Sequence, residues 1–154
     1  MTSSRLNADE YFLQIANLVA QRSTCRRRNV GCVLVDEKNH IVATGYNGVP
    51  SGFTHCLDVP CKGATAPSGQ ALDQCLAVHA EVNAFLQCTS AEKLTAYLST
   101  TPCFTCAKMI CNSNVVRIVA SEWYVHEEVK AMLWEAKIPV EIKEFHVSRE
   151  SDNL

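Results

Sequence analysis

One histidine and two cysteines in this sequence have the spacing of metal ligands. Residues 79–81 read His-Ala-Glu, and residues 102–106 read Pro-Cys-Phe-Thr-Cys. Because proline suits the first turn of a helix, Cys103 and Cys106 are expected to share one face of that turn. The imidazole of His79 and the two thiolates supply three ligands to a tetrahedral zinc ion, and a fourth position stays open for water. The spacing therefore favours a catalytic zinc site over a structural one.

Glu81 is expected to stand beside this metal site. It lies two residues after His79, close enough to exchange protons with a zinc-bound water without binding the metal. Zinc lowers the pKa of such a water from 15.7 to about 7, so hydroxide is available at neutral pH. The alternative is a closed zinc knuckle with Cys111 as fourth ligand. Cys111 lies more than a helical turn beyond Cys106, and a knuckle has no need of Glu81, so the sequence favours the catalytic site.

Helices and strands are expected to alternate along the chain. Asn7 and Glu10 have the spacing of a capping box at a helix start. Hydrophobic periodicity predicts helices over 8–22, 75–88, 103–111 and 125–136, and strands over 30–35, 41–46, 94–99, 115–120 and 140–147. The first two strands form an antiparallel hairpin, and strands separated by helices imply parallel neighbours with right-handed crossovers. The predicted fold class is α/β, a three-layer α/β/α sandwich around a five-stranded mixed sheet.

We expect a single domain over residues 1–154, which is an ordinary domain length. A long irregular insertion, rich in glycine and proline, occupies residues 48–75. A loop of that length inside a compact domain is usually functional or held by some added constraint. Residues 147–154 form a polar tail, which we expect to be frayed.

The composition is that of a globular protein with little net charge. Hydrophobic residues make up 47%, charged residues 19%, and the formal net charge is −2. This balance excludes a disordered chain and gives no global reason to bind a nucleic acid or an anionic membrane. No apolar run approaches a membrane span, and residues 1–10 show no secretory signal. With nine cysteines, an odd number, we expect a reducing, cytoplasmic compartment (host cytoplasm for a viral protein) and no disulfide framework.

The two metal-ligand segments match the H-x-E and P-C-x-x-C signature of the zinc nucleobase deaminases. Within that cytidine-deaminase-like superfamily, three further segments resemble deoxycytidylate (dCMP) deaminases of the phage and bacterial type. They are Val-Gly-Cys-Val at 30–33, Gly-Tyr-Asn-Gly at 45–48 and His-Ala-Glu-Val-Asn-Ala at 79–84. The resemblance covers roughly residues 6–146. It implies a cytidine-deaminase-like fold, zinc-dependent hydrolysis of dCMP to dUMP and ammonia, and a hexameric assembly.

The same resemblance implies roles for several residues. Glu81 would deliver one proton to N3 of the cytosine ring and a later one to the leaving amino group, while the activated water attacks C4. Asn47 would bind the sugar, and the Ala80 N–H would contact the pyrimidine carbonyl. The turn that holds Tyr46 and Gly48 would belong to a site where dCTP activates and dTTP inhibits, each with Mg²⁺. The alternative interpretation, which we would prefer without the zinc motif beside it, is that these residues only form a turn, because their types favour turns.

A nucleotide substrate also needs a phosphate site. Four of the fourteen basic residues fall within seven positions, at Arg22, Arg26, Arg27 and Arg28. Guanidinium groups suit phosphate oxygens, and the alternative is a solvated basic loop. We assign Arg26 and its neighbour Asn29 to the substrate and Arg27 to the effector, although the sequence alone does not divide them.

Tyr124 is similar in kind to an aromatic residue that this family places over the substrate. The Trp123-Tyr124 pair departs from the Tyr-Arg pair of some bacterial members, which puts phosphate recognition at this point in doubt. Packing at a surface or an interface is the other interpretation of both residues.

The remaining cysteines fall into two groups. Cys56, Cys61 and Cys75 lie in the insertion, beside His55, and could hold a second, structural zinc ion. The alternative is free thiols in a mobile loop. The others lie in or beside predicted elements and are expected to be small core residues: Cys25, Cys32, Cys88 and Cys111.

Two other functions stay open at this point. One is deamination of dCTP, free cytidine or adenosine in tRNA; the lack of a broad basic surface speaks against a polynucleotide, and the arginine cluster against a free nucleoside. The other is a non-catalytic zinc- and nucleotide-binding accessory protein, which would have no need of Glu81. Ammonia release distinguishes the two classes.

Overall fold

The computed structural model describes residues 5–67, 69–124 and 126–144. Its α-helices are α1 (Ala8–Ala20), α2 (Lys62–Thr65), α3 (Ala80–Gln87), α4 (Phe104–Cys111) and α5 (Glu127–Glu135), and a 3₁₀ turn, η1, spans Leu72–Gln74. Its strands are β1 (Gly31–Asp36), β2 (Ile41–Tyr46), β3 (Leu94–Leu98), β4 (Val115–Ala120) and β5 (Val140–Ile142). The capping box is present, because the Asn7 side chain accepts from the Glu10 N–H at 2.9 Å and the Glu10 carboxylate accepts from the Asn7 N–H at 3.0 Å.

The five strands form one mixed sheet in the order β2-β1-β3-β4-β5. β1 is antiparallel to both β2 and β3, whereas β3, β4 and β5 run parallel to one another. The antiparallel hairpin, the mixed sheet and the parallel neighbours joined by helices confirm the predicted fold class. Because β2 and β3 both oppose β1, the carboxyl ends of β2, β3 and β4 lie at the same edge of the sheet.

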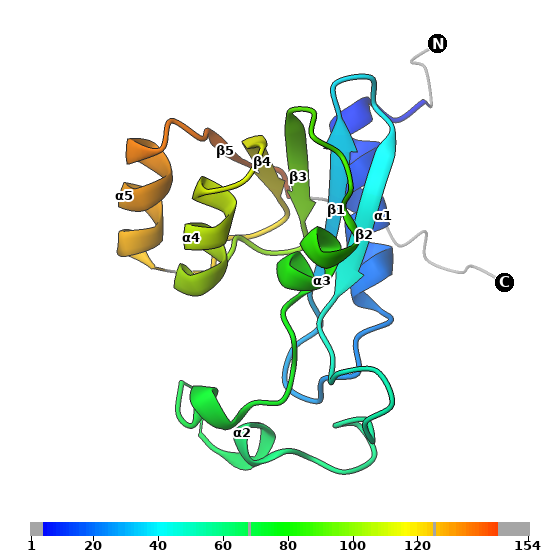
Figure 1. The fold of residues 1–154 in the computed structure, drawn as a ribbon, viewed down its shortest axis with the longest axis vertical. Coiled ribbons are helices and arrows are strands. Elements are labelled where there is room, and N and C mark those ends of the chain that lie inside the picture. The colour runs from blue at the N-terminus through cyan, green and yellow to red at the C-terminus, as the bar shows by residue number, and fades with distance from the viewer. Residues whose placement is uncertain (1–4, 68, 125, 145–154) are drawn as a thin grey trace, which may run out of the picture.

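Helices cover both faces of the sheet (Figure 1). Side chains of β1 alternate between the two faces, so Cys32 and Leu34 enter one core while Val33 and Val35 enter the other. One core lies beneath α1 and contains Phe12, Leu13, Ala16, Val33, Val35, Tyr97 and Val119. The larger core lies beneath α3, α4 and α5 and includes Ala80, Ala84, Ala107, Ile110, Val129 and Leu133. This second layer carries the segments with the predicted metal ligands.

Several predicted boundaries are wrong. The helix predicted over 75–88 begins only at Ala80, because Val78 is extended and pairs with Gly48 through backbone hydrogen bonds of 2.8 and 3.1 Å. The first helix ends at Ala20 rather than at 22, and the strand predicted over 140–147 ends at Ile142. Position 125, the predicted helix start, and residues 145–154, which include the polar tail, lie outside the described residues. The insertion leaves the sheet after β2 and extends beyond it, with α2 and η1 as its regular elements (Figure 1).

An ionic network ties α1 to the sheet. The Asp9 carboxylate accepts hydrogen bonds from Arg117 Nη1 and Nη2 at 2.9 and 2.7 Å, from Lys143 Nζ at 2.6 Å and from the Tyr97 hydroxyl at 2.7 Å. Arg117 also donates to Glu141 Oε1 at 2.8 Å. Hydrogen bonding by Arg117, with Lys143 and Tyr97, holds the pKa of Asp9 well below its usual range, although partial burial opposes the shift. The charged form of Asp9 therefore stabilises the fold.

We expect Asp9→Asn to lower the free energy of unfolding at pH 7 by about 1–3 kcal/mol, a range that allows for the partial exposure of the network. Because the folded-state pKa of Asp9 lies below its unfolded value of about 3.9, this contribution is present above that value. This stabilisation is lost as the pH falls from about 3.9 through the lower, folded-state pKa of Asp9. Urea unfolding of both proteins at about pH 7 and pH 3 measures it. The exposed Asp58→Asn is the control, and a deficit that does not shrink on acidification would contradict the assignment.

Candidate active site

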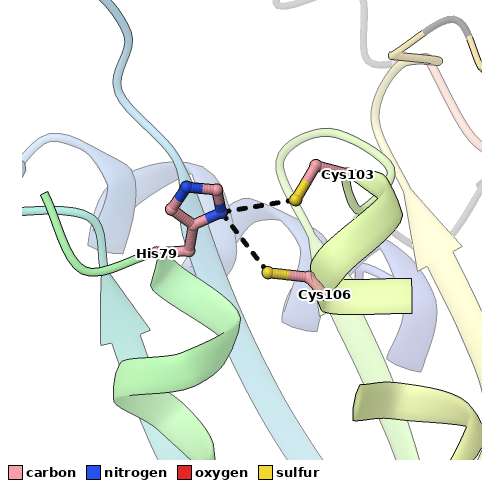
Figure 2. Close-up of side chains that lie close together, drawn as sticks. All are labelled: His79, Cys103 and Cys106. Carbon is pink, nitrogen blue, oxygen red and sulfur yellow. Dashed lines mark hydrogen bonds between the residues drawn. The ribbon is translucent and has the colours of Figure 1, made fainter. Parts of the chain in front are cut away.

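The three predicted metal ligands meet at the N-termini of two helices. His79 is the N-cap residue of α3, Cys103 is the N-cap residue of α4, and Cys106 lies in the first turn of α4. His79 Nδ1 lies 3.4 Å from Cys103 Sγ and 3.4 Å from Cys106 Sγ (Figure 2). Tetrahedral zinc with ordinary bond lengths separates a nitrogen and a sulfur ligand by about 3.6 Å, so the donor atoms fit zinc.

Among the described residues, this is the one group of three or more histidine, cysteine or acidic side chains that lie close enough together to hold a metal ion. Its three ligand atoms all lie within 4.8 Å of one another. Cys111, the fourth ligand of the alternative zinc knuckle, lies at the opposite end of α4 and is not part of the group. Three protein ligands and an open fourth position are typical of a catalytic zinc site.

The pKa shifts of the two thiols and of His79 show why the site suits a cation. Hydrogen bonds from Cys106 and His79 stabilise the Cys103 thiolate and lower the pKa of Cys103 to about 3, against the cost of burial. The neighbouring Cys103 thiolate and burial raise the pKa of Cys106. The hydrogen bond to Cys103 raises the pKa of His79. The protein alone therefore supports one thiolate here, and a divalent ion would stabilise the second and displace the remaining proton.

Glu81 lies in the first turn of α3 and is 4% exposed. Burial raises the pKa of its carboxyl group, and the nearby Cys103 charge acts in the same direction. A carboxyl group with a raised pKa can hold a proton and release it near neutral pH, which is what a general acid–base needs. Its burial also keeps bulk water from competing for that proton.

The start of α3 is held against the end of β2 by close backbone packing. A Cβ atom at Gly45 would collide with the Ala80 carbonyl oxygen and the Ala84 amide nitrogen. The Asn83 side chain donates to the Tyr46 carbonyl oxygen at 2.8 Å. The glycine at position 45 thus lets α3 approach the sheet, and His79, Ala80 and Glu81 come with it.

Asn47, the predicted sugar ligand, is buried and holds the adjoining loop. Its Oδ1 accepts from the Val30 N–H at 2.8 Å, and its Nδ2 donates to the Arg28 carbonyl oxygen at 2.7 Å. Its own carbonyl oxygen accepts from the Ser23 hydroxyl at 2.8 Å. Asn47 also lines the cavity described next, so this residue both positions residues 23–30 and belongs to the site.

A cavity of about 270 Å³ opens beside the metal ligands. It is lined by residues that follow three strands at their common edge, namely Asn47 after β2, Thr100 and Thr101 after β3, and Tyr124 after β4. Ala80, in the first turn of α3, also lines it, where backbone N–H groups have no partner within the helix. Ligands commonly bind outside the carboxyl ends of strands in such sheets.

Arg28 and Tyr124 form one wall of this cavity. The Arg28 guanidinium lies 4.4 Å from the centre of the Tyr124 ring. Arg28 Nη2 donates to Thr100 Oγ1 and to Glu122 Oε1, both at 3.1 Å. The Tyr124 N–H donates to Thr101 Oγ1 at 2.7 Å. Sequence reasoning missed both threonines, which the rule about strand ends could have found.

The arginine cluster divides in the structure. Arg27 and Arg28 line the cavity, and Arg27 Nη1 also donates to the Gly63 carbonyl oxygen at 2.6 Å. Arg26 and Asn29, the predicted substrate residues, are exposed and are not among its lining residues. Tyr46 and Gly48, the residues of the predicted effector turn, are also absent from the lining of the cavity. They lie beside the start of α3 and the segment before it.

All nine cysteines lie in the described part of the chain and are free. Cys32 is in the larger core, and Cys88 and Cys111 pack at its border, as predicted. Cys25 is buried too, but it lines the cavity together with Cys75. Cys56 and Cys61 face each other within the insertion.

Comparisons with known proteins agree on one family. The model described as the cytidine and deoxycytidylate deaminase zinc-binding region matches residues 6–122. The deoxycytidylate deaminase of Mycobacterium phage D29 is 40% identical over 123 residues, which cover 75% of this chain and 95% of that one. The deoxycytidylate deaminase of Schizosaccharomyces pombe is 39% identical over 133 residues, which cover 83% of this chain and 41% of that one. This chain therefore spans about two fifths of the fission yeast protein.

Solved structures show the same fold. The dCMP deaminase from cyanophage S-TIM5, in complex with dCMP and dUMP, superposes with a TM-score of 0.73. The two sequences are 27% identical, and the match covers 92% of this chain and all of that one.

None of the helices in the described part of this chain has the length and apolar character that a membrane crossing requires.

Proposed function

This chain belongs to the cytidine and deoxycytidylate deaminase family, and from that premise we propose that it hydrolyses dCMP to dUMP and ammonia with zinc as its cofactor. The observation that carries the proposal is the position of Glu81. This buried carboxyl group lines the same cavity as His79 and Cys103, two of the three predicted zinc ligands. A scaffold that only bound zinc would have no use for it.

The residues of the cavity suit the hydrolysis of an aromatic amine. Zinc held by His79, Cys103 and Cys106 would supply a water molecule acidified to a pKa of about 7. Glu81 would take one proton from the attacking water and deliver it to N3 of the cytosine ring, and it would later carry the proton of the new C4 hydroxyl to the amino group. The new bond joins the water oxygen to C4, the C4–N bond breaks, and ammonia leaves.

The remaining cavity residues would orient the substrate. In this proposal the Ala80 N–H donates to the pyrimidine carbonyl, and the Asn47 amide contacts the sugar. Tyr124 supplies an aromatic wall next to the base. These three roles are supported by the family resemblance and by the presence of all three residues in the lining of one cavity.

For the 5′-phosphate we favour Arg28 and Arg27 over Arg26 and Asn29. The first two line the cavity, and the second two are exposed outside its lining. The Arg28 guanidinium is already aimed along the cavity wall by Thr100 and Tyr124. Its partner Glu122 is largely exposed, so a phosphate could replace this carboxylate at small cost.

Regulation by dCTP and dTTP with Mg²⁺, through Tyr46 and Gly48, is a further proposal that the family resemblance supports. Arg27, predicted from the sequence as an effector residue, lines the cavity and is assigned here to the substrate phosphate. The packing offers a route for it. Tyr46 and Gly48 contact the start of α3 and the segment before it, so an effector bound there would shift His79 and Glu81 relative to α4. Hexameric assembly and a cytoplasmic location are proposed on the resemblance and on the nine free cysteines.

We expect Glu81→Gln to lower kcat for dCMP by about 10²–10⁴-fold, because the variant keeps the shape of the side chain and removes the proton carrier. Zinc content should stay unchanged, since Glu81 is not a ligand. Ammonia release and elemental analysis measure the two quantities. Glu37→Gln, in an exposed turn, is the matched control. A Glu81→Gln enzyme with near wild-type turnover would exclude the mechanism, and wild-type protein that binds zinc and nucleotide without releasing ammonia would favour the accessory-protein function.

Arg28→Ala should raise KM for dCMP by about 10–100-fold, the cost of one charge-assisted hydrogen bond to a phosphate. The value of kcat/KM for deoxycytidine, which has no phosphate, should change little. Arg22→Ala, exposed at the end of α1, is the control. Equal losses for the nucleotide and the nucleoside would show that Arg28 acts only on the fold of the cavity. A loss specific to dCMP in Arg26→Ala instead would restore the sequence-based assignment.

Ammonia release from dCMP, dCTP, deoxycytidine and cytidine, with and without Mg·dCTP or Mg·dTTP, tests regulation and substrate choice. We expect dCMP turnover to rise with dCTP and fall with dTTP at subsaturating substrate. Turnover that neither nucleotide changes would refute the effector site. Turnover of dCTP would indicate a wider phosphate pocket than the one proposed.

A further inference from the structure

Two adjacent threonines hold the cavity wall that Arg28 and Tyr124 form. Thr100 and Thr101 follow β3, are 5% and 2% exposed, and both line the cavity. Buried hydroxyl groups need hydrogen-bond partners, and each of these hydroxyls has its partner in that wall. Thr100 Oγ1 accepts from Arg28 Nη2 at 3.1 Å, and Thr101 Oγ1 accepts from the Tyr124 N–H at 2.7 Å. One dipeptide therefore contacts both residues of the wall.

The four residues form a closed network of contacts. The Thr101 hydroxyl also donates to the Tyr124 carbonyl oxygen at 3.4 Å, so it pairs with both backbone polar groups of Tyr124. The ring of Tyr124 lies 4.4 Å from the Arg28 guanidinium, which returns to Thr100 through its hydrogen bond. Because each member has two neighbours in the network, none of them can shift without displacing another.

The threonine pair is joined to a predicted zinc ligand by a short, stiff connection. Pro102 alone separates Thr101 from Cys103, the N-cap residue of α4. Proline fixes its own φ angle and keeps the residue before it extended. The Thr101 N–H donates to the Glu122 carbonyl oxygen at 3.0 Å, which ties the pair to the segment after β4. The position of the wall is therefore fixed relative to Cys103.

We propose that Thr100 and Thr101 are positioning residues that set two substrate contacts relative to the zinc ligands, Thr100 through Arg28 and Thr101 through Tyr124. This inference rests on the proposed function, in which Arg28 binds the 5′-phosphate and Tyr124 lies next to the base. Because one dipeptide sets both contacts, it also sets the distance between them. That distance selects a nucleotide whose base reaches the zinc site while its first phosphate reaches Arg28.

The chemistry of Thr100 suits this role better than that of the other partner of Arg28. A hydroxyl group carries no charge, so it orients the guanidinium group and leaves its positive charge available to an anion. Glu122 is a charged partner, but its side chain is 64% exposed, and an ion pair of this kind contributes little. Without the Thr100 hydroxyl, Arg28 would keep only this exposed carboxylate and the Tyr124 ring as partners.

Kinetics with a nucleotide and a nucleoside distinguish the two roles. Thr100→Val and Thr101→Val each remove a hydroxyl group and keep the shape of the side chain. We expect Thr100→Val to raise KM for dCMP by about 3–10-fold, the cost of one hydrogen bond, with kcat and the deoxycytidine reaction unchanged. Thr101→Val should lower kcat/KM for dCMP and deoxycytidine by one common factor, also about 3–10-fold, because both substrates carry the base. Thr100→Ser and Thr101→Ser keep the hydroxyl and should behave as the wild type, as should the exposed control Thr89→Val.

Double-mutant cycles show whether each threonine acts through its partner. Thr100→Val should have no further effect on dCMP in the Arg28→Ala enzyme, and Thr101→Val none in the Tyr124→Ala enzyme. Additive losses in either cycle would overturn the proposal. A rise in KM for dCMP in Glu122→Gln but not in Thr100→Val would overturn it too, because the carboxylate would then position Arg28. Should Thr101→Val fail to fold, the Thr100 cycle alone decides.

Binding measurements separate this inference from the proposed catalysis. Calorimetric titration of dCMP and deoxycytidine into zinc-loaded Glu81→Gln, with and without each valine variant, measures positioning in the absence of turnover. We expect Thr100→Val to weaken binding of dCMP alone and Thr101→Val to weaken binding of both. A wild type that binds dCMP without releasing ammonia would refute the proposed function and leave this pattern intact. An active wild type whose valine variants bind and turn over both ligands equally well would refute the positioning roles alone.

Discussion

The close contact between β2 and the start of α3 is the constraint on which the site depends. His79 and Glu81 reach the metal position only because α3 begins at Ala80, and α3 can begin there only because Gly45 leaves room for its backbone. The backbone pairing of Gly48 with Val78 then keeps the preceding residues extended. Cys103 and Cys106 arrive from β3 through α4, so the two halves of the donor set are joined through the sheet itself. A shift of either helix would change the spacing of the three donor atoms.

The direction of the strands explains why the remaining site residues gather where they do. The antiparallel β1 lies between β2 and β3 and leaves these two strands pointing the same way. Asn47, Thr101 and Tyr124, from three distant parts of the chain, therefore emerge at one edge. The Asn47 amide and the Thr101 hydroxyl also hold backbone in place, so this part of the cavity is organised before any ligand enters. This preorganisation lowers the cost of orienting a substrate.

The sequence was most informative where the chemistry is local and least informative where distant segments meet. Ligand spacing predicted His79, Cys103 and Cys106, and periodicity predicted all five strands. The helix predicted from 75 was wrong by five residues, because the pairing of Val78 with Gly48 overrides local helix preference. The path of residues 23–30 decides which of the four arginine side chains reach the cavity, and Asn47, just after β2, fixes that path. No pattern within the cluster could distinguish Arg28 from Arg26.

The thiols show how one residue type acquires different roles from its surroundings. Cys32 is enclosed by apolar side chains, where burial raises the pKa and favours a neutral, inert thiol. Cys103 is held as a thiolate by its hydrogen bonds, and Cys61 receives backbone N–H groups that act in the same direction. Burial alone would make all of these thiols core residues. Donors aimed at the sulfur distinguish thiols whose pKa is lowered from inert core thiols, and such donors depend on how the chain folds around each cysteine.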